Sequence, residues 1–504
     1  MWSFVLFALS IDILTKAHTH YFLFWSVTAL LVVFGWVTAI GLAITGLGAA
    51  LRASSARAYD VLAPIGALAC VGFVAHAYPV LNFVILILAP AGVIWARVRR
   101  IRWNLATVHG LLQKACLFLS PVLPIFWLNA TTFERYGPTT VPSLEDARRV
   151  PARPGRVATD DFYLFVFDGW SGQFTLPGGK VNPEFPNLAA AAEEMCLFTD
   201  AHSPACFTVN SLPRLLFQTR ARFALRGGTL GFWDGEFHAA RELPSLFTRA
   251  RERGYRTYMV GWFHPYQVLL GDTTDFVRSV CYGHHLGETP WQLGLAFLWD
   301  SVHAVDPKLA AATVGSFPVM RNHAIAWQCA TLVEYARAVL DDPRPGQFAV
   351  FHLPPPHWPY CFTRNGPRAD LNVEYEDTVA NAMDSHRYVD HLIGDFRSRL
   401  RDSGRWEDAT VVFVSDHSCP DDPELHRAPS AEQWNHVPLL IKFPGQRQTV
   451  RVDAPFSTVH LAEVLDAVRE RHTAREDLDR LVRERRLHEP LADEELYFRH
   501  PIMK

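Results

Sequence analysis

The chain has 504 residues, which is more than one ordinary domain needs. Its formal net charge is −3, so it has no overall basic field that would attract nucleic acid. Hydrophobic residues make up 49% of the sequence and concentrate in residues 1–130, whereas almost all acidic residues come later. This uneven distribution predicts a helical transmembrane domain over residues 1–130, followed by a polar domain.

Four long apolar stretches in the first part of the chain are predicted to cross a membrane as helices. They cover residues 22–49, 58–78, 79–97 and 111–130. Each is close to the roughly 20 residues that a spanning helix needs. Residues 1–15 are a fifth candidate, although they are short and carry Asp12.

Basic residues between these stretches predict their orientation. Arg52 and Arg57 mark one loop, and a cluster from Arg97 to Lys114 marks another. Because loops rich in Arg and Lys stay in the cytoplasm, residue 131 and the chain after it would lie outside. The sequence therefore predicts an integral protein of the cell (inner) membrane with an extracytoplasmic C-terminal domain.

The rest of the chain has a different pattern. Residues 131–160 are rich in Pro and Arg and lack periodicity, which predicts a linker. Across residues 161–504, short apolar runs alternate with helical patterns. Strands are predicted at 162–167, 255–263, 347–353 and 410–415, and helical segments at 323–340, 376–400 and 458–486. This alternation predicts an α/β domain with a largely parallel central sheet.

Three of the predicted strands carry or run into polar residues that suit a metal ion. These residues are Asp168, His352, His357, Asp416 and His417. Since the carboxyl ends of parallel strands meet at one edge of a sheet, the side chains are expected to converge there. Carboxylates together with imidazoles suit zinc or manganese better than calcium or magnesium. Each residue alone also has an ordinary structural explanation, such as a turn, a helix cap or a surface hydrogen bond.

Several segments, in this order along the chain, resemble the alkaline phosphatase superfamily and specifically its sulfatase-like branch. They are FYLFVFDGW (162–170), FPNLAAAAEEMCLFTDAHSPA (185–205), GYRTYMVGWF (254–263), FHLPPPHWPY (351–360), VVFVSDHS (411–418) and HVPLLIKFPG (436–445). The resemblance implies a metal-dependent enzyme with an α/β catalytic domain. A membrane part before such a domain resembles the phosphoethanolamine transferases and the phosphoglycerol transferases that make lipoteichoic acid.

The segment TVNSLP, residues 208–213, resembles the motif that holds the nucleophilic Thr of phosphoethanolamine transferases. The resemblance implies that Thr208 is the nucleophile. It also implies that Thr208 shares one metal ion with Asp168, Asp416 and His417.

Three histidines are implied to line the adjoining substrate site, namely His352, His357 and His426. Of these, His357 or His426 would donate a proton to the leaving group. His426 lies in ELHRAPSAEQWNHVP, which is similar to a segment of the same transferases. His436, before the VPLLI run, is a weaker candidate.

Several positions depart from the transferase pattern. The first carboxylate is Asp168 rather than Glu, and Ser418 and Cys419 replace a Gly-Glu pair. Cysteines that flank the nucleophile in phosphoethanolamine transferases are replaced here by Pro204 and Arg214.

The sequence predicts a transferase that moves a phospho-head-group, phosphoethanolamine or phosphoglycerol, from a membrane phospholipid donor to a glycan or lipid acceptor. Alternatives are a phosphodiesterase that uses water, a sulfatase, and a family member without catalytic activity. The sulfatase alternative lacks its signature, because Cys206 is not followed by the C/S-x-P/A-x-R pattern that forms formylglycine. Thr208 could also be an ordinary helix N-cap.

Overall fold

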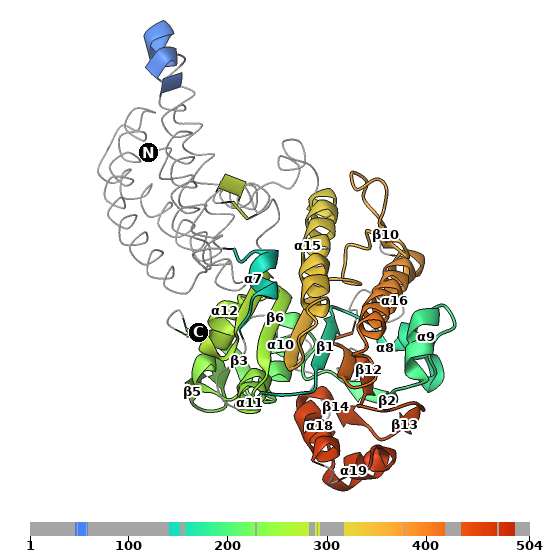
Figure 1. Cartoon of the computed structure of the whole chain (residues 1–504). Coiled ribbons are helices and arrows are strands. Elements are labelled where there is room, and N and C mark those ends of the chain that lie inside the picture. The colour runs from blue at the N-terminus through green and yellow to red at the C-terminus, as the bar shows by residue number, and fades with distance from the viewer. Residues whose placement is uncertain are drawn as a thin grey trace, which may run out of the picture. The chain divides into compact units, whose positions relative to one another are not determined.

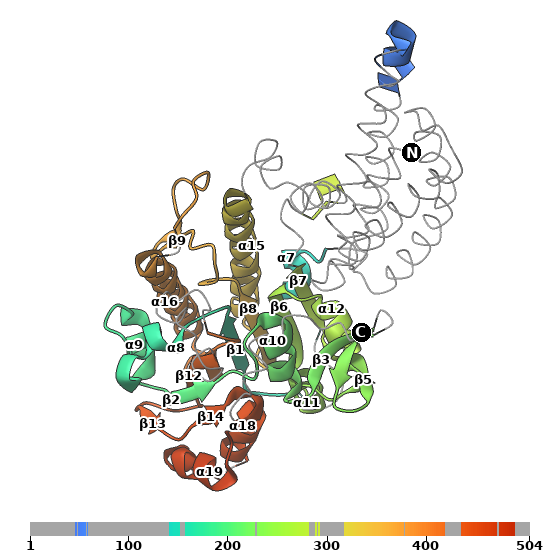
Figure 2. The ribbon, with the colours of Figure 1, turned by 180° about the vertical axis from the view of Figure 1, so that it is seen from behind.

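The structure is a computed structural model, shown from two sides in Figures 1 and 2. It describes residues 46–58, 141–151, 157–281, 288–292, 317–418, 435–470 and 473–488, apart from positions 48, 57, 227, 228, 290 and 377. The predicted membrane spans lie outside these residues except at a few positions within 46–49 and at 58. Among the described residues, no helix has the length and apolar character to cross a membrane.

Most described residues belong to one compact unit, Pro138–His285 with Pro318–Lys504, which is built on a nine-stranded sheet. In spatial order the strands are β13 (Val450–Val452), β2 (Cys196–His202), β12 (His436–Lys442), β11 (Thr410–Ser415), β1 (Phe162–Phe167), β8 (Gln347–Leu353), β6 (Arg256–Phe263) and β7 (Phe276–Cys281), and β14 (Phe456–Ser457) also pairs with β2. Only β12 runs antiparallel to its neighbours within this sheet. The largely parallel sheet that the sequence predicts is therefore confirmed, with its four predicted strands.

Helices cover both faces of the sheet, which explains why the central strands are apolar along their whole length. One face packs against α7 (Leu144–Arg148), α9 (Pro186–Ala192), α15 (Phe317–Leu340) and α16 (Val379–Asp402). The other carries α10 (Thr208–Phe217), α11 (Leu246–Glu252), α12 (Tyr266–Leu270) and α18 (Leu461–Arg469). Strand β1 is buried at every position and lies near the middle of the sheet.

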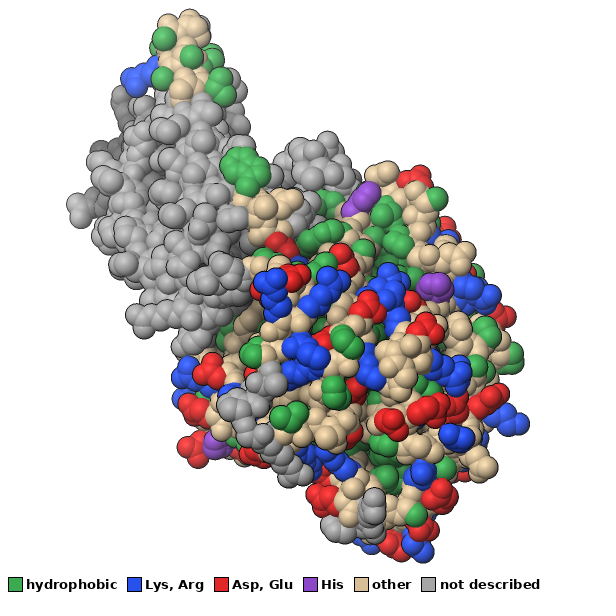
Figure 3. All heavy atoms as spheres, in the orientation of Figure 1, with side chains coloured by type: hydrophobic (Ala, Val, Ile, Leu, Met, Phe, Trp, Pro, Cys, Tyr) green, Lys and Arg blue, Asp and Glu red, His purple; other side chains and the backbone are tan. Residues whose placement is uncertain are grey.

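Smaller elements lie around this core. A separate antiparallel sheet contains β3 (Arg222–Arg226), β4 (Thr229–Trp233) and β5 (Phe237–Ala239), and β9 (Phe362–Thr363) pairs with β10 (Gly366–Pro367). The predicted helical segment 458–486 is divided into α18 and α19 (Leu478–Arg485). Figure 3 shows basic and acidic side chains interspersed over the visible face of this unit, with no large area of one sign.

Part of the predicted linker 131–160 packs within this compact unit. Ser143 caps α7, because its side chain accepts a hydrogen bond from the Asp146 amide while the Asp146 carboxylate accepts one from the Ser143 amide. Ala147 and Val150 are buried in the core cluster that includes β1 and α15.

Candidate active site

Four polar side chains from three adjacent strands meet at the carboxyl edge of the sheet. Asp168 follows β1, His352 lies near the end of β8, and Asp416 and His417 follow β11. The Nε2 atom of His352 lies 3.2 Å from Asp168 Oδ2, and the Nε2 atom of His417 lies 3.4 Å from Asp168 Oδ1. All four side chains are buried, so the convergence that the sequence predicts is present.

Thr208 joins this group as the first residue of α10. Its hydroxyl donates to Asp168 Oδ2 at 3.0 Å, and His417 Nε2 lies 3.0 Å from the Thr208 hydroxyl oxygen. The N-cap residue of α10 is Phe207, and no side chain caps the helix. The N-cap alternative for Thr208 is therefore wrong: its hydroxyl lies among the site carboxylate and imidazole. The positive end of the α10 dipole also favours negative charge at this position.

The loop before Thr208 is held from two sides. Asn435 accepts a hydrogen bond from the Ser203 amide through its carbonyl oxygen, at 2.7 Å, and its side chain donates back to the Ser203 carbonyl at 3.0 Å. On the other side, the buried Arg214 donates to the Pro204 carbonyl at 2.8 Å and to the Ala221 carbonyl at 3.1 Å. These contacts fix the direction in which the chain enters α10.

The buried cluster fits a divalent metal ion. Ligand atoms of Asp168, His352 and Asp416 all lie within 4.8 Å of one another. The atoms Asp168 Oδ1, Asp416 Oδ2 and His352 Nε2 are buried and have no hydrogen bond. Leaving buried charged oxygens unpaired is costly, and a cation among them removes that cost.

The tautomer of His352 supports the same conclusion. Its Nδ1 lies 2.9 Å from the Trp262 carbonyl oxygen, to which it can only donate, and 2.8 Å from the Tyr266 hydroxyl. A neutral His352 therefore presents a lone pair at Nε2, toward Asp168 and Asp416. An imidazole held from behind in this way is typical of metal ligands.

The pKa shifts of the site residues are consistent with negative charges that lie close together. Burial, followed by the charge of Asp168, raises the pKa of Asp416. Burial also acts to raise the pKa of Asp168, but the neighbouring imidazoles, with His357 foremost, lower it overall. Burial acts to lower the pKa of His417, yet the Asp416 and Asp168 carboxylates outweigh burial and raise it to about 9.

The other predicted histidines differ in position. His357 follows β8, and its side chain is 27% exposed with Nε2 3.9 Å from Asp168 Oδ1, so it lies at the edge of the buried cluster. His436 instead contacts Thr199, Gly172 and the ring of His202. His426, with Cys419, lies outside the described residues.

One further histidine at this edge was missed by the sequence analysis. His264 follows β6 and is fully buried, and its Nε2 donates to the Thr208 carbonyl at 3.0 Å. Burial lowers its pKa to about 3, so it is neutral. The available signal was its place directly after the GYRTYMVGWF strand, the same kind of position that marks Asp168 and Asp416.

Comparison with known proteins identifies the family to which the chain belongs. A protein-family model described as Sulfatase matches residues 163–467, more than half of the chain. The chain belongs to the sulfatase family, and the predicted resemblance to the sulfatase-like branch of the alkaline phosphatase superfamily is confirmed. Membership of this family supports an enzyme.

Two curated relatives match short parts of the chain. Endo-4-O-sulfatase of Bacteroides thetaiotaomicron is 34% identical over 93 residues, which are 17% of this chain and 18% of the relative. Arylsulfatase K of Danio rerio is 32% identical over 75 residues, which are 14% of each chain. Each match therefore spans less than a fifth of the relative.

Three solved structures of differing proteins are similar to this chain in fold. A phosphonate monoester hydrolase of Agrobacterium radiobacter has 20% identity and a TM-score of 0.40, covering 61% of this chain and 73% of that chain. The lipoteichoic acid synthase of Listeria monocytogenes has 14% identity and a TM-score of 0.37, covering 64% and 76%. The C-terminal periplasmic domain of EcEptC from Escherichia coli, in a complex with zinc, has 14% identity and a TM-score of 0.39, covering 63% and 83%.

Proposed function

We propose that the protein is a membrane-bound, metal-dependent phosphotransferase with Thr208 as its nucleophile. It moves phosphoethanolamine or phosphoglycerol from a phospholipid to a glycan or lipid acceptor outside the cell membrane. The observation that carries the proposal is the Thr208 hydroxyl, 3.0 Å from both Asp168 and His417 at the carboxyl edge of the sheet. The apolar stretches within residues 1–130 would keep the catalytic unit at the surface where its donor lies.

Asp168, Asp416 and His417 would hold a divalent ion together with the Thr208 oxygen, and the structure adds His352 to the residues that face it. A mixed carboxylate and imidazole set suits zinc or manganese. Bound there, the ion would lower the pKa of the Thr208 hydroxyl and neutralise charge on the phosphoryl oxygens.

The proposed reaction has two steps, in which Thr208 is the nucleophile and a histidine transfers the proton. The Thr208 proton leaves to solvent, its oxygen bonds to the head-group phosphorus, and the bond from phosphorus to the diacylglycerol oxygen breaks. The departing oxygen takes a proton from His357, whose partly exposed ring lies at the edge of the site, or from His426. In the second step the acceptor hydroxyl bonds to phosphorus and gives its proton to that histidine. The bond from phosphorus to the Thr208 oxygen breaks, and that oxygen takes back a proton from solvent.

The sulfatase alternative has less support from the site. Sulfatase chemistry needs a Cys or Ser that becomes formylglycine, whereas the side chain placed beside Asp168 and His417 is that of Thr208. Cys206 is buried two positions earlier, and its sequence context lacks the modification pattern.

The test uses the full-length protein, Mn²⁺ or Zn²⁺, and phospholipids labelled in the head group. We expect the wild-type protein to release diacylglycerol and Thr208→Ala to release none, with Thr208→Ser keeping partial activity because it retains a hydroxyl. Thr219→Ala is the matched control, since it removes a similar hydroxyl just beyond α10. Full turnover by Thr208→Ala would overturn the mechanism. Release of labelled head group to water, with or without acceptor, would instead establish the phosphodiesterase alternative.

A further inference from the structure

A cavity lies at the edge of the central sheet opposite the candidate active site. Its volume is about 620 Å³, and its lining includes Phe162, Phe348 and Thr410, which stand at or next to the starts of β1, β8 and β11. The candidate active site lies past the other ends of the same three strands. Since β1 has six residues, the two sites are separated by roughly 20 Å of strand. The cavity is therefore a separate site within the same unit.

The floor of this cavity is apolar and largely aromatic. Phe162 stacks on Phe348 with ring centroids 4.8 Å apart, and Phe443 and Leu246 also line the cavity. Helices α11 and α18 form its walls. A volume within 300–1,000 Å³ and an apolar lining with a few polar groups are typical of small-molecule sites.

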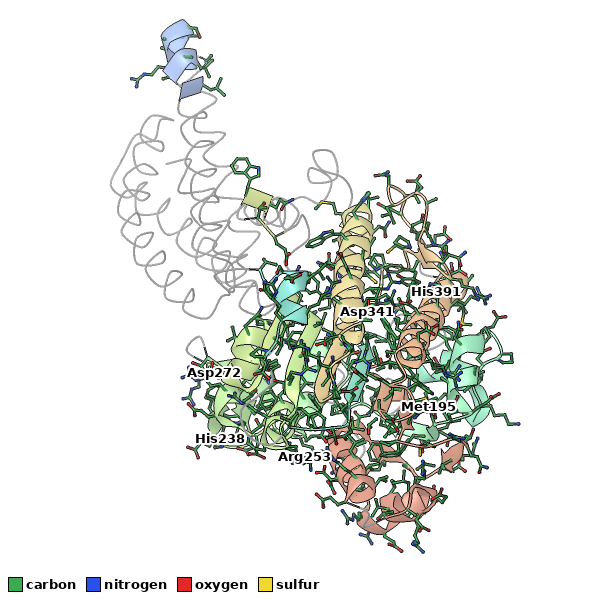
Figure 4. All side chains as sticks on the ribbon, in the orientation of Figure 1. Met195, His238, Arg253, Asp272, Asp341 and His391 are labelled. Atoms are coloured by element: carbon green, nitrogen blue, oxygen red, sulfur yellow. The ribbon has the colours of Figure 1, made fainter. Side chains whose placement is uncertain are left out.

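The polar part of the lining is rich in arginine. Arg249 and Arg253 come from the α11 side, and Arg469 and Arg475 from the α18 side. Three acidic side chains accompany these four arginines, Asp160, Asp466 and Glu476. The lining therefore carries an excess of positive charge. Arg253, labelled in Figure 4, lies where α11 ends beside α18.

These arginines are not equally matched by carboxylates. Asp466 is shared by two of them, at 2.7 Å from Arg253 and 3.5 Å from Arg249. Among the residues that the structure describes, Arg475 has a single carboxylate pairing, at 3.7 Å with its neighbour Glu476, and its Nη1 atom is buried without a hydrogen-bond partner. A guanidinium with an unused donor, in a cavity that also has apolar lining residues, suits one anionic group.

We propose that this cavity binds an amphiphile with one anionic head, whose acyl chain lies on the Phe162–Phe348 floor while its head pairs with Arg475. An acyl chain buries apolar area on the aromatic floor, and a single negative charge matches the excess of arginine. A carboxylate, a phosphate monoester and a sulfate ester share this chemistry. The site is independent of the reaction assigned to Thr208.

Binding is tested on the full-length protein in lipid nanodiscs, with octanoate as the probe and saturation-transfer NMR as the readout. Octanol supplies the chain without the charge, and inorganic phosphate supplies a charge without the chain. Octyl phosphate and octyl sulfate distinguish the head groups. We expect saturable octanoate binding, with octanol and phosphate each at least tenfold weaker.

Variants locate the binding. Arg475→Gln should weaken octanoate at least tenfold, and Ala250→Phe, which fills the cavity, should abolish its binding while an unchanged melting profile shows that the variant folds. Arg451→Gln removes a surface arginine outside the cavity and should leave binding unchanged. Thr208→Ala should also bind octanoate normally, whatever its activity. Octanoate binding that is absent, that matches octanol, or that survives both cavity variants would overturn the proposal.

Discussion

Asp416 is a buried carboxylate that lowers stability by itself and is also a candidate metal ligand. It is fully buried, its Oδ2 has no hydrogen bond, and burial together with Asp168 raises its pKa. Neutral partners for this side chain are the Gly169 and His417 amides, which donate to Oδ1 at 3.2 and 2.8 Å. The other oxygen points into the cluster that fits a cation, so the residue is expected to cost stability whenever the ion is absent.

Removal of the metal should therefore lower the melting temperature of the wild-type protein. A bound ion contributes about 2.7 kcal/mol when its free concentration is 100 times its Kd. Asp416→Asn should melt at nearly the same temperature with and without Mn²⁺ or Zn²⁺, because it loses the ligand and also relieves the repulsion with Asp168. Differential scanning calorimetry before and after chelation measures both effects. Asp453→Asn, at an exposed carboxylate, is the control and should behave as the wild type. An equal metal response in Asp416→Asn would contradict this assignment.

His386 is a buried histidine whose role is structural. Its Nδ1 donates to the Ala382 carbonyl at 2.8 Å, and its Nε2 accepts from the Ser171 amide at 3.2 Å, so the ring is neutral. Burial lowers its pKa from 6.5 to about 4. Its contribution to stability is complete above the unfolded pKa of 6.5 and is lost as the pH falls through the folded pKa near 4.

Between these two pH values the unfolded state binds the extra proton, which gives a slope of up to about 1.4 kcal/mol per pH unit. His386→Gln should remove this share of the slope, which is measured by urea unfolding at several pH values. His391→Gln, on the same helix α16, is the control. If His386→Gln and the wild type lost stability in parallel as the pH fell, the assignment of a neutral His386 would be wrong.

At the level of elements, α10 and the loop before it place the candidate nucleophile. Arg214 lies on α10 and reaches back to the Pro204 carbonyl, while His264 from the end of β6 donates to the Thr208 carbonyl. Arg214 donates these hydrogen bonds to the Pro204 and Ala221 carbonyls rather than to the side chains of the site. It is a positioning residue, which holds the loop so that the first turn of α10 presents its hydroxyl to Asp168.

Arg214→Met should lower kcat more than it changes KM, because it disturbs the direction of Thr208 and leaves the substrate contacts in place. It should also destabilise the protein by about 1–3 kcal/mol, since the buried Pro204 carbonyl and the partly buried Ala221 carbonyl lose their donor. Arg226→Met, at an exposed arginine on β3, is the control for losing a charge. Partial recovery of kcat with added guanidinium would support a positioning role. A change confined to KM would contradict it.

The elements also show what could be read from sequence. The strands that end in Asp168, Asp416 and His352 were predictable, because fully apolar runs followed by polar residues are typical of central parallel strands. The antiparallel direction of β12 was not, since an apolar run does not specify the direction of its pairing. The helix α7 was missed because five residues are too few for a periodic pattern, and only the capping box at Ser143 marks it.

The same limits apply to the site. Thr208 was predicted from a motif. Its contacts with Asp168 and His417 depend on the fold, which brings Thr208 next to His417 although they are 209 positions apart in the sequence. His264 was missed because a lone histidine after a strand has many ordinary explanations. His352 was assigned by resemblance to the substrate side, and the structure shows its Nε2 beside the carboxylates of Asp168 and Asp416.

In the molecule as a whole, one central sheet carries two separate candidate sites at its opposite edges. The carboxyl edge holds the acidic cluster and Thr208, and the amino edge holds the arginine-lined cavity. The proposed transfer reaction would use only the first site, together with a membrane to supply the donor and retain diacylglycerol. The central claim is thus that the head group passes through a covalent bond to one residue.

That claim is tested most directly by trapping the intermediate. Full-length protein is incubated with head-group-labelled phospholipid and Mn²⁺ or Zn²⁺ without acceptor, quenched in acid, and digested for mass spectrometry. The account predicts a peptide that carries the phospho-head-group on Thr208, in parallel with released diacylglycerol, and its absence from Thr208→Ala. Diacylglycerol release without any modified peptide, or a modification on another residue, would contradict it.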